Sequence, residues 1–140
     1  MSEVEVLHDV IIVGAGPAGL AAGLYAARDR YSALLLEKNG LPGGQIMLTE
    51  HIENYPGYEK IGGFELVEHM KSQTLRFGAR IKTNQAVTSI KRQADGVFLV
   101  ETNKGENAFR SRAIILAPGS DYRRLGIPGE TELRQQGKVS

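Results

Sequence analysis

Short apolar runs separated by glycine-rich breaks give the first half of the chain its pattern. Residues 10–13 form one apolar run and residues 33–36 form a second. Between them lie a glycine-rich stretch at residues 14–19 and a segment of small residues with helical spacing. Continuous apolar runs of this length are typical of strands that are buried on both faces. The pattern therefore predicts a strand, a turn, a helix and a second strand over residues 9–37.

The three glycines of the turn suit the binding of a phosphate group. Gly14 permits a tight turn after the strand, Gly16 lets a pyrophosphate approach the backbone, and Gly19 lets the helix lie close to the sheet. The start of the helix directs N–H groups and the positive end of its dipole at the phosphates. Pro17 fits an early helical position, where its missing N–H is no loss.

An acidic residue follows the second apolar run. Glu37 comes 18 residues after Gly19, near the spacing expected of a carboxylate that accepts ribose hydroxyls. A carboxylate would also repel a 2′-phosphate. A chance glycine turn is the plainer alternative, but the flanking strands and the acid favour a dinucleotide site. The motif alone does not distinguish FAD from NAD.

A long loop and a second helix are expected next. Residues 38–63 hold a cluster of glycines and prolines, and a structureless loop of that length is usually functional. Residues 63–77 show amphipathic helical spacing, and Gly78 suits the end of that helix. Residues 79–83 should form the third parallel strand.

The pattern then changes to that of an antiparallel meander. Residues 86–91, 97–102 and 108–112 resemble three short strands, separated by turn signals. Residues 113–116 are expected to form a fourth, buried strand. The predicted fold class is α/β, a Rossmann-like parallel sheet with a small three-stranded meander laid over it.

Composition narrows the class of function. The 140 residues have a net charge of +1, which gives no sign of a nucleic-acid or anionic-membrane partner. The sequence has no cysteine, which excludes a disulfide framework or a dithiol pair within it, and its three histidines lack metal-ligand spacing. No stretch has the length of a membrane span, and the polar N-terminus is unlike a signal peptide. A cytoplasmic location is expected.

Several short motifs occur in an order that resembles the low-molecular-weight, bacterial-type thioredoxin reductases. They are GAGPAG (14–19), LLLEK (34–38), PGGQ (42–45), ENYPG (53–57), AIILAPG (113–119) and LGIPGE (125–130). In that family these segments belong to the first part of the FAD domain. The resemblance, rather than the glycine motif, selects FAD as the cofactor.

The resemblance also implies which residues hold FAD. Those of the glycine turn would surround the pyrophosphate, and those that follow the second strand would contact the adenosine ribose. Gly43, Gly44 and Gln45 would lie along the ribityl and flavin side, Asn54 near the flavin ring, and Val87 beside the adenine. For Gln45 and Asn54 the alternative is a loop side chain that bonds its own backbone. The implied cofactor-binding residues are Gly14, Ala15, Gly16, Pro17, Ala18, Gly19, Glu37, Lys38, Gly43, Gly44, Gln45, Asn54, Val87, Ala117 and Gly119.

The resemblance implies that residues 1–140 are a partial FAD-binding domain. Family members continue into a Cys-x-x-Cys segment, an NADPH domain and a closing strand and helix of the FAD domain. The full enzyme, usually a homodimer, would pass electrons from NADPH to FAD, then to the dithiol and then to thioredoxin. No catalytic residue is assigned within these 140 residues, and the chain alone should not reduce a disulfide by this route.

Two alternatives stay open at the level of sequence. The chain could be the FAD domain of a related reductase that serves ferredoxin or a peroxiredoxin, or a stand-alone nucleotide-binding module without catalysis. In either case the implied strand order is 3-2-1-4-5 with the fifth strand absent. Residues 113–116 would then form an apolar edge that favours association with another chain.

Overall fold

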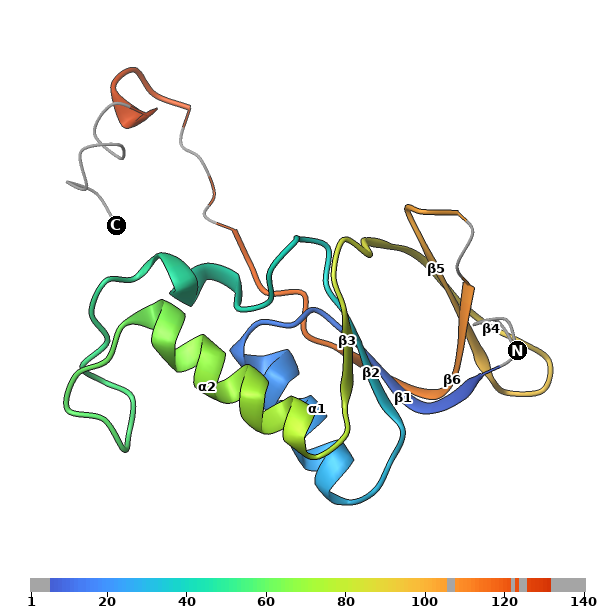
Figure 1. Cartoon of the computed structure of the whole chain (residues 1–140). Helices are drawn as coiled ribbons and strands as arrows, with labels where there is room; N and C mark the ends of the chain where they lie inside the picture. The colour runs from blue at the N-terminus through green and yellow to red at the C-terminus, as the bar shows by residue number, and fades with distance from the viewer. Residues whose placement is uncertain (1–5, 106–107, 122, 124–125, 132–140) are drawn as a thin grey trace.

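The computed structural model describes residues 6–105, 108–121, 123 and 126–131 and builds them around one sheet (Figure 1). The strands lie in the order β3-β2-β1-β6-β5-β4. The elements are, in chain order, β1 (Leu7–Val13), α1 (Pro17–Arg28), β2 (Ala33–Leu36), the 3₁₀ helix η2 (Gly44–Leu48), α2 (Gly63–Arg76), β3 (Arg80–Lys82), β4 (Val87–Arg92), β5 (Phe98–Thr102) and β6 (Ala108–Leu116).

A parallel ladder forms the part of the sheet that the sequence predicted from its apolar runs. β1 pairs with β2 from Val10↔Ala33 to Val13↔Leu36, and β2 pairs with β3 in the same direction. All four residues of β2 are buried, as expected of a strand covered on both faces. The predicted strand–turn–helix–strand unit over residues 9–37 is therefore confirmed.

Two apolar clusters lie on opposite faces of this ladder because successive side chains of a strand alternate between faces. The helices cover one face, and the meander formed by β4, β5 and β6 curves over the other (Figure 1). This arrangement confirms the predicted α/β fold with a meander over the parallel sheet. The helix-side cluster includes Ile12, Leu20, Leu35 and Val67, and the meander-side cluster contains Ile11, Leu34, Leu36, Val100 and Phe109.

One continuous strand replaces two that the sequence analysis separated. Residues 108–112 and 113–116 both belong to β6, which pairs with β5 up to Ser111 and with β1 from Arg110 to Leu116. The strand thus passes from the meander into the parallel ladder without a break. Residues 113–116 are not buried as first expected, since Ile115 is 39% exposed and Leu116 is 65% exposed. Their exposure agrees instead with the apolar edge expected where a fifth strand is absent. Among the described residues, nothing pairs with the second edge of β6 beyond Ser111.

The loop over residues 38–63 has more structure than expected. It contains η2 and an isolated antiparallel bridge between Ile52 and Ile61. η2 packs directly against the start of α2, and this contact requires a glycine at position 63. A Cβ at Gly63 would lie 1.8 Å from the carbonyl oxygen of Ile46. The predicted helix over residues 63–77 corresponds closely to α2.

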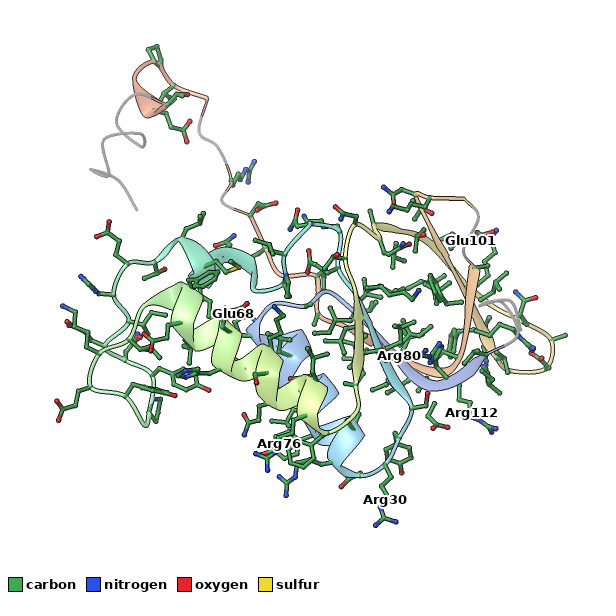
Figure 2. The ribbon with its side chains drawn as sticks, viewed as in Figure 1. Arg30, Glu68, Arg76, Arg80, Glu101 and Arg112 are labelled. Carbon is green, nitrogen blue, oxygen red and sulfur yellow. The ribbon has the colours of Figure 1, made fainter. Side chains whose placement is uncertain are left out.

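Charged side chains on the meander are exposed and contribute little to stability. Lys91 Nζ donates to Glu101 Oε2 at 3.2 Å, and Arg112 Nε lies 3.7 Å from Asp9 Oδ1. Figure 2 labels Glu101 and Arg112 among these side chains. The hydrogen bond from Lys91 lowers the pKa of the Glu101 carboxyl, and a second one from Ser89 adds to this effect. The apolar clusters, not these ion pairs, hold the meander against the sheet.

The free edge of β6 gives a testable prediction about association. An exposed apolar edge offers unpaired backbone groups to another chain, so we expect the 140-residue chain to self-associate as its concentration rises. Leu116→Lys should shift it towards monomer because a lysine on the edge opposes strand pairing. Leu75→Lys is the matched control, since Leu75 is an exposed leucine of α2 away from the edge. Sedimentation velocity measures the outcome, and a wild-type chain that is monomeric at every concentration would contradict it.

Candidate dinucleotide-binding cleft

Three backbone segments meet without spare room at the turn between β1 and α1. Gly14 has a φ of +100°, and a Cβ added there would lie 2.2 Å from the carbonyl oxygen of Ala117. A Cβ at Gly19 would lie 2.0 Å from the carbonyl oxygen of Gly14. Both positions therefore require glycine for packing, which agrees with the roles inferred for a tight turn and a close helix.

Gly16 differs from the other two glycines because it faces open space. A Cβ at Gly16 would have no neighbour nearer than Gly44 Cα, at 4.0 Å. Gly16 is the N-cap residue of α1, and Pro17 is its first helical residue. The first N–H groups of a helix have no intrahelical partner, and the positive end of the dipole lies there. The space in front of Gly16 is thus suited to an anionic group that approaches the backbone.

The carboxylate of Glu37 fastens the glycine turn to the end of β2. Glu37 is only 5% exposed, and its Oε2 accepts a hydrogen bond from the backbone N–H of Ala15 at 2.9 Å. Its Oε1 accepts another from the N–H of Asn39, also at 2.9 Å. The two donors offset the cost of burying the charge. An ionised carboxylate has about four lone-pair sites, so both oxygens keep the capacity to accept a ligand hydroxyl.

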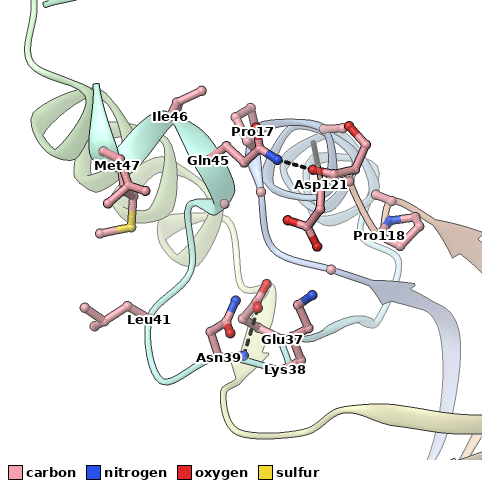
Figure 3. A pocket seen from close by; sticks show the side chains of 18 residues that line it. Pro17, Glu37, Lys38, Asn39, Leu41, Gln45, Ile46, Met47, Pro118 and Asp121 are labelled. Atoms are coloured by element: carbon pink, nitrogen blue, oxygen red, sulfur yellow. Dashed lines mark hydrogen bonds between the residues drawn. The ribbon is translucent and has the colours of Figure 1, made fainter. Parts of the chain in front are cut away.

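An open cleft of about 680 Å³ lies over the turn and beside Glu37 (Figure 3). Its volume falls within the range of about 300–1,000 Å³ that is usual for small-molecule sites. The walls come from the glycine turn, the segment after β2, η2 and the segment after β6. The lining residues are Gly14, Gly16, Pro17, Ala18, Glu37, Lys38, Asn39, Leu41, Gly44, Gln45, Ile46, Met47, Leu48, Ala117, Pro118, Gly119, Ser120 and Asp121.

Most of the residues that the sequence analysis assigned to the cofactor meet at this cleft. Three others lie directly behind its wall: Ala15 donates to Glu37, Gly19 packs under Gly14, and the N–H of Gly43 donates to the Ala15 carbonyl at 2.8 Å. The assigned residues that line the cleft are Gly14, Gly16, Pro17, Ala18, Glu37, Lys38, Gly44, Gln45, Ala117 and Gly119.

Two assigned residues lie elsewhere. Asn54 is exposed in the loop between the bridge residues Ile52 and Ile61 and does not line the cleft. Val87 begins β4 and packs against the meander-side cluster. Their contacts with FAD remain predictions drawn from the resemblance.

Residues that sequence reasoning missed complete the cleft. They come mostly from η2 and from the segment after β6, which the Gln45 side chain joins by donating a hydrogen bond to the carbonyl oxygen of Ser120. Gln45 and Ser120 are 75 positions apart in the sequence, so no local pattern could have linked them. The missed lining residues are Asn39, Leu41, Ile46, Met47, Leu48, Pro118, Ser120 and Asp121.

The chemical groups that line the cleft are of the types that FAD needs. Gly16 and Gly44 both line the cleft and carry no side chain, so only backbone borders the space where a pyrophosphate would sit. Glu37 supplies an acceptor for hydroxyls, while Leu41 and Met47 supply apolar surface. Within the described part of the chain, no group of three His, Cys, Asp or Glu residues is placed to hold a metal ion.

Comparison with known proteins agrees with this geometry. The profile of the pyridine nucleotide-disulphide oxidoreductase family matches residues 8–139, and the chain belongs to that family. It is 44% identical over 137 residues to the thioredoxin reductase of Bacillus subtilis (strain 168). The aligned residues are 98% of this chain and 42% of that protein. The chain therefore spans less than half the length of that curated relative.

Two further relatives extend the comparison. The crystal structure of Lactococcus lactis thioredoxin reductase matches with a TM-score of 0.80 and 41% identity, over 91% of this chain and 41% of that one. The bifunctional thioredoxin reductase/thioredoxin of Mycobacterium leprae (strain TN) is 43% identical over 134 residues, which are 95% of this chain and 28% of that protein. The predicted resemblance to thioredoxin reductases is thus confirmed. No helix among the described residues has the length and apolarity to cross a membrane.

The different surroundings of Gly14 and Gly16 predict different outcomes for the same substitution. Gly14→Ala should lower the free energy of unfolding by about 1–3 kcal/mol from backbone strain alone, and contact with Ala117 should add to the loss. Gly16→Ala should change stability by less than ~0.5 kcal/mol because its methyl group meets open space. It should nevertheless weaken the binding of FAD by about tenfold or more, equivalent to ~1.4 kcal/mol.

Urea unfolding and titration of FAD fluorescence measure the two effects separately. Gly105→Ala serves as the control for strain without contact, since Gly105 has a φ of +61° and no atom within 4 Å of its added Cβ. A Gly16→Ala chain with unchanged FAD affinity would show that no phosphate approaches this backbone.

Proposed function

We propose that residues 1–140 form the FAD-binding part of a flavoprotein disulfide reductase whose final acceptor is thioredoxin. The observation that carries this proposal is the open backbone at Gly16 directly beside the buried carboxylate of Glu37. One position receives an anion without steric hindrance, and the other accepts hydroxyl hydrogens. Together they match the pyrophosphate and the adenosine ribose of a dinucleotide.

The other walls of the cleft suit the rest of FAD. Lys38 adds a cation at the ribose end, and Gly44 and Gln45 of η2 border the side assigned to the ribityl chain and the flavin. Ala117 and Gly119 carry the backbone past the glycine turn at the end of β6. When bound, the flavin would supply a carrier that accepts two electrons and releases them.

The acceptor is proposed from the relatives. Thioredoxin reductases are similar to this chain over nearly its whole length, and one of them is a bifunctional thioredoxin reductase/thioredoxin. The 140 residues contain no cysteine, so exchange with a thioredoxin disulfide would need cysteines from outside them. NADPH as electron donor, a homodimeric state and a cytoplasmic location stay predictions of the same resemblance.

Two measurements on the chain test the proposal. Chain refolded with FAD should retain a flavin that absorbs in the visible range, and titration should give saturable binding. The same preparation should not oxidise NADPH in the presence of thioredoxin, since its cleft residues only bind and orient the cofactor. The full-length Bacillus subtilis thioredoxin reductase provides the positive control for both assays.

The outcomes separate the proposal from its alternatives. Bound FAD without turnover supports a cofactor-binding part. A folded chain that does not bind FAD would overturn the proposal, and if it binds another adenine nucleotide it would be a nucleotide-binding module of a different kind. NADPH-dependent reduction of thioredoxin by the 140 residues alone would contradict the conclusion that the exchange needs cysteines from elsewhere.

A further inference from the structure

The carboxyl ends of three neighbouring parallel strands meet at the cleft. β1 lies between β2 and β6, and Val13 pairs with Leu36 on one side and with Leu116 on the other. The ladder continues one step further, because the N–H of Gly14 donates to the Leu36 carbonyl at 2.8 Å and the N–H of Ala117 donates to the Val13 carbonyl at 2.9 Å. The glycine turn therefore has the segment after β2 on one side and the segment after β6 on the other.

Each of these two flanking segments brings one carboxylate to the cleft. Glu37 follows β2 directly, and Asp121 comes after the end of β6. Both residues line the cleft, and Figure 3 shows the Asp121 carboxylate directed into it. Neighbouring strands lie about 4.8 Å apart, so the two segments leave the sheet roughly 10 Å from each other. The helix start at Gly16, which suits an anion, follows the strand between them.

The two carboxylates differ in the hydrogen bonds that they already accept. Glu37 accepts from the N–H groups of Ala15 and Asn39. Asp121 is exposed, and its carboxylate takes part in no ion pair between residues that the structure describes. An ionised carboxylate only accepts hydrogen bonds. The Asp121 carboxylate is therefore available to a hydroxyl of a ligand, and it would repel a phosphate.

This arrangement matches the chemical order of the groups in FAD. The pyrophosphate of FAD has the adenosine ribose on one side and the polyhydroxyl ribityl chain on the other. With the phosphates at Gly16 and the ribose at Glu37, as the proposed function assigns them, the ribityl chain would extend towards the segment after β6. The hydroxyls of that chain are the groups of FAD that a free carboxylate at Asp121 suits.

We propose that Asp121 is a specificity-determining residue that accepts hydroxyl hydrogens from the ribityl chain of FAD. The proposal rests on the proposed function, which assigns FAD to the cleft. A hydrogen bond from a hydroxyl to a carboxylate is charge-assisted and stabilises the complex, whereas the same carboxylate repels the phosphates. Asp121 therefore favours a flavin dinucleotide over an adenine nucleotide that ends at its phosphates.

Asp121→Ala separates the two parts of the ligand. Calorimetric titration of the 140-residue chain should show FAD binding weakened by about five- to tenfold, while ADP, which has no ribityl chain, should bind at least as tightly as to wild type. Asp121→Asn keeps an acceptor oxygen and should restore part of the FAD affinity. Asp29→Ala is the matched control, because Asp29 is an exposed aspartate at the C-terminal end of α1 and does not line the cleft.

An FAD analogue with an unsubstituted alkyl chain in place of the ribityl chain tests the hydroxyls themselves. The wild-type chain should prefer FAD to this analogue, and Asp121→Ala should reduce that preference by the same five- to tenfold factor, about 1–1.4 kcal/mol. An equal preference in both chains would overturn the role of Asp121. Tighter binding of FAD by Asp121→Ala would also overturn it, because the carboxylate would then only repel the phosphates.

Failure of this role and failure of the proposed function give different results. If wild type and Asp121→Ala bind both FAD and ADP with the same affinities, the role of Asp121 is wrong while the cofactor assignment stands. If the folded wild-type chain binds ADP but not FAD, or binds neither, the cofactor assignment is overturned and the role of Asp121 falls with it.

Discussion

The close meeting of three backbones at Gly14 is the constraint on which the rest of the site depends. The end of β1, the start of α1 and the end of β6 approach so closely that neither Gly14 nor Gly19 has room for a methyl group. This contact fixes where α1 begins relative to the carboxyl ends of the parallel strands. Since the helix start is the feature that can receive an anion, the position of the cleft follows from this packing.

Glu37 links this packing to the chemistry of the site. The sequence predicts that Glu37 accepts ribose hydroxyls, and the structure shows a second role, because Glu37 accepts a hydrogen bond from the N–H of Ala15 in the glycine turn. A buried carboxylate with two N–H donors holds the turn and the loop after β2 together. Loss of this side chain would therefore disturb the turn as well as any ligand contact, so a change in affinity at this position would not by itself identify a ribose contact.

Sequence reasoning recovered the elements whose signals are local. The apolar run of β2 and the small residues of α1 follow from period and composition, and the glycine spacing placed the turn between them. The continuity of β6 was missed because a polar stretch, residues 110–112, interrupts its apolar pattern. Arg110 and Ser111 belong to the strand through their pairing with β5 and β1, and no property of the residues themselves reveals that partner.

Residue spacing predicted the local part of the cleft. Its distant segments were assigned only through the resemblance, which named Gly44, Gln45, Ala117 and Gly119 but not Ser120 or Asp121. The glycine turn and Glu37 lie within one strand–turn–helix–strand unit, so their proximity is encoded in spacing. Ser120 and Asp121 reach the cleft only because β6 runs parallel to β1 and ends beside Gly14. The same strand therefore closes the meander-side core, leaves an open edge beyond Ser111 and brings residues 117–121 to the cleft. A ligand that contacts the turn, η2 and residues 117–121 together would stabilise the folded chain, because it binds only the state in which these segments meet.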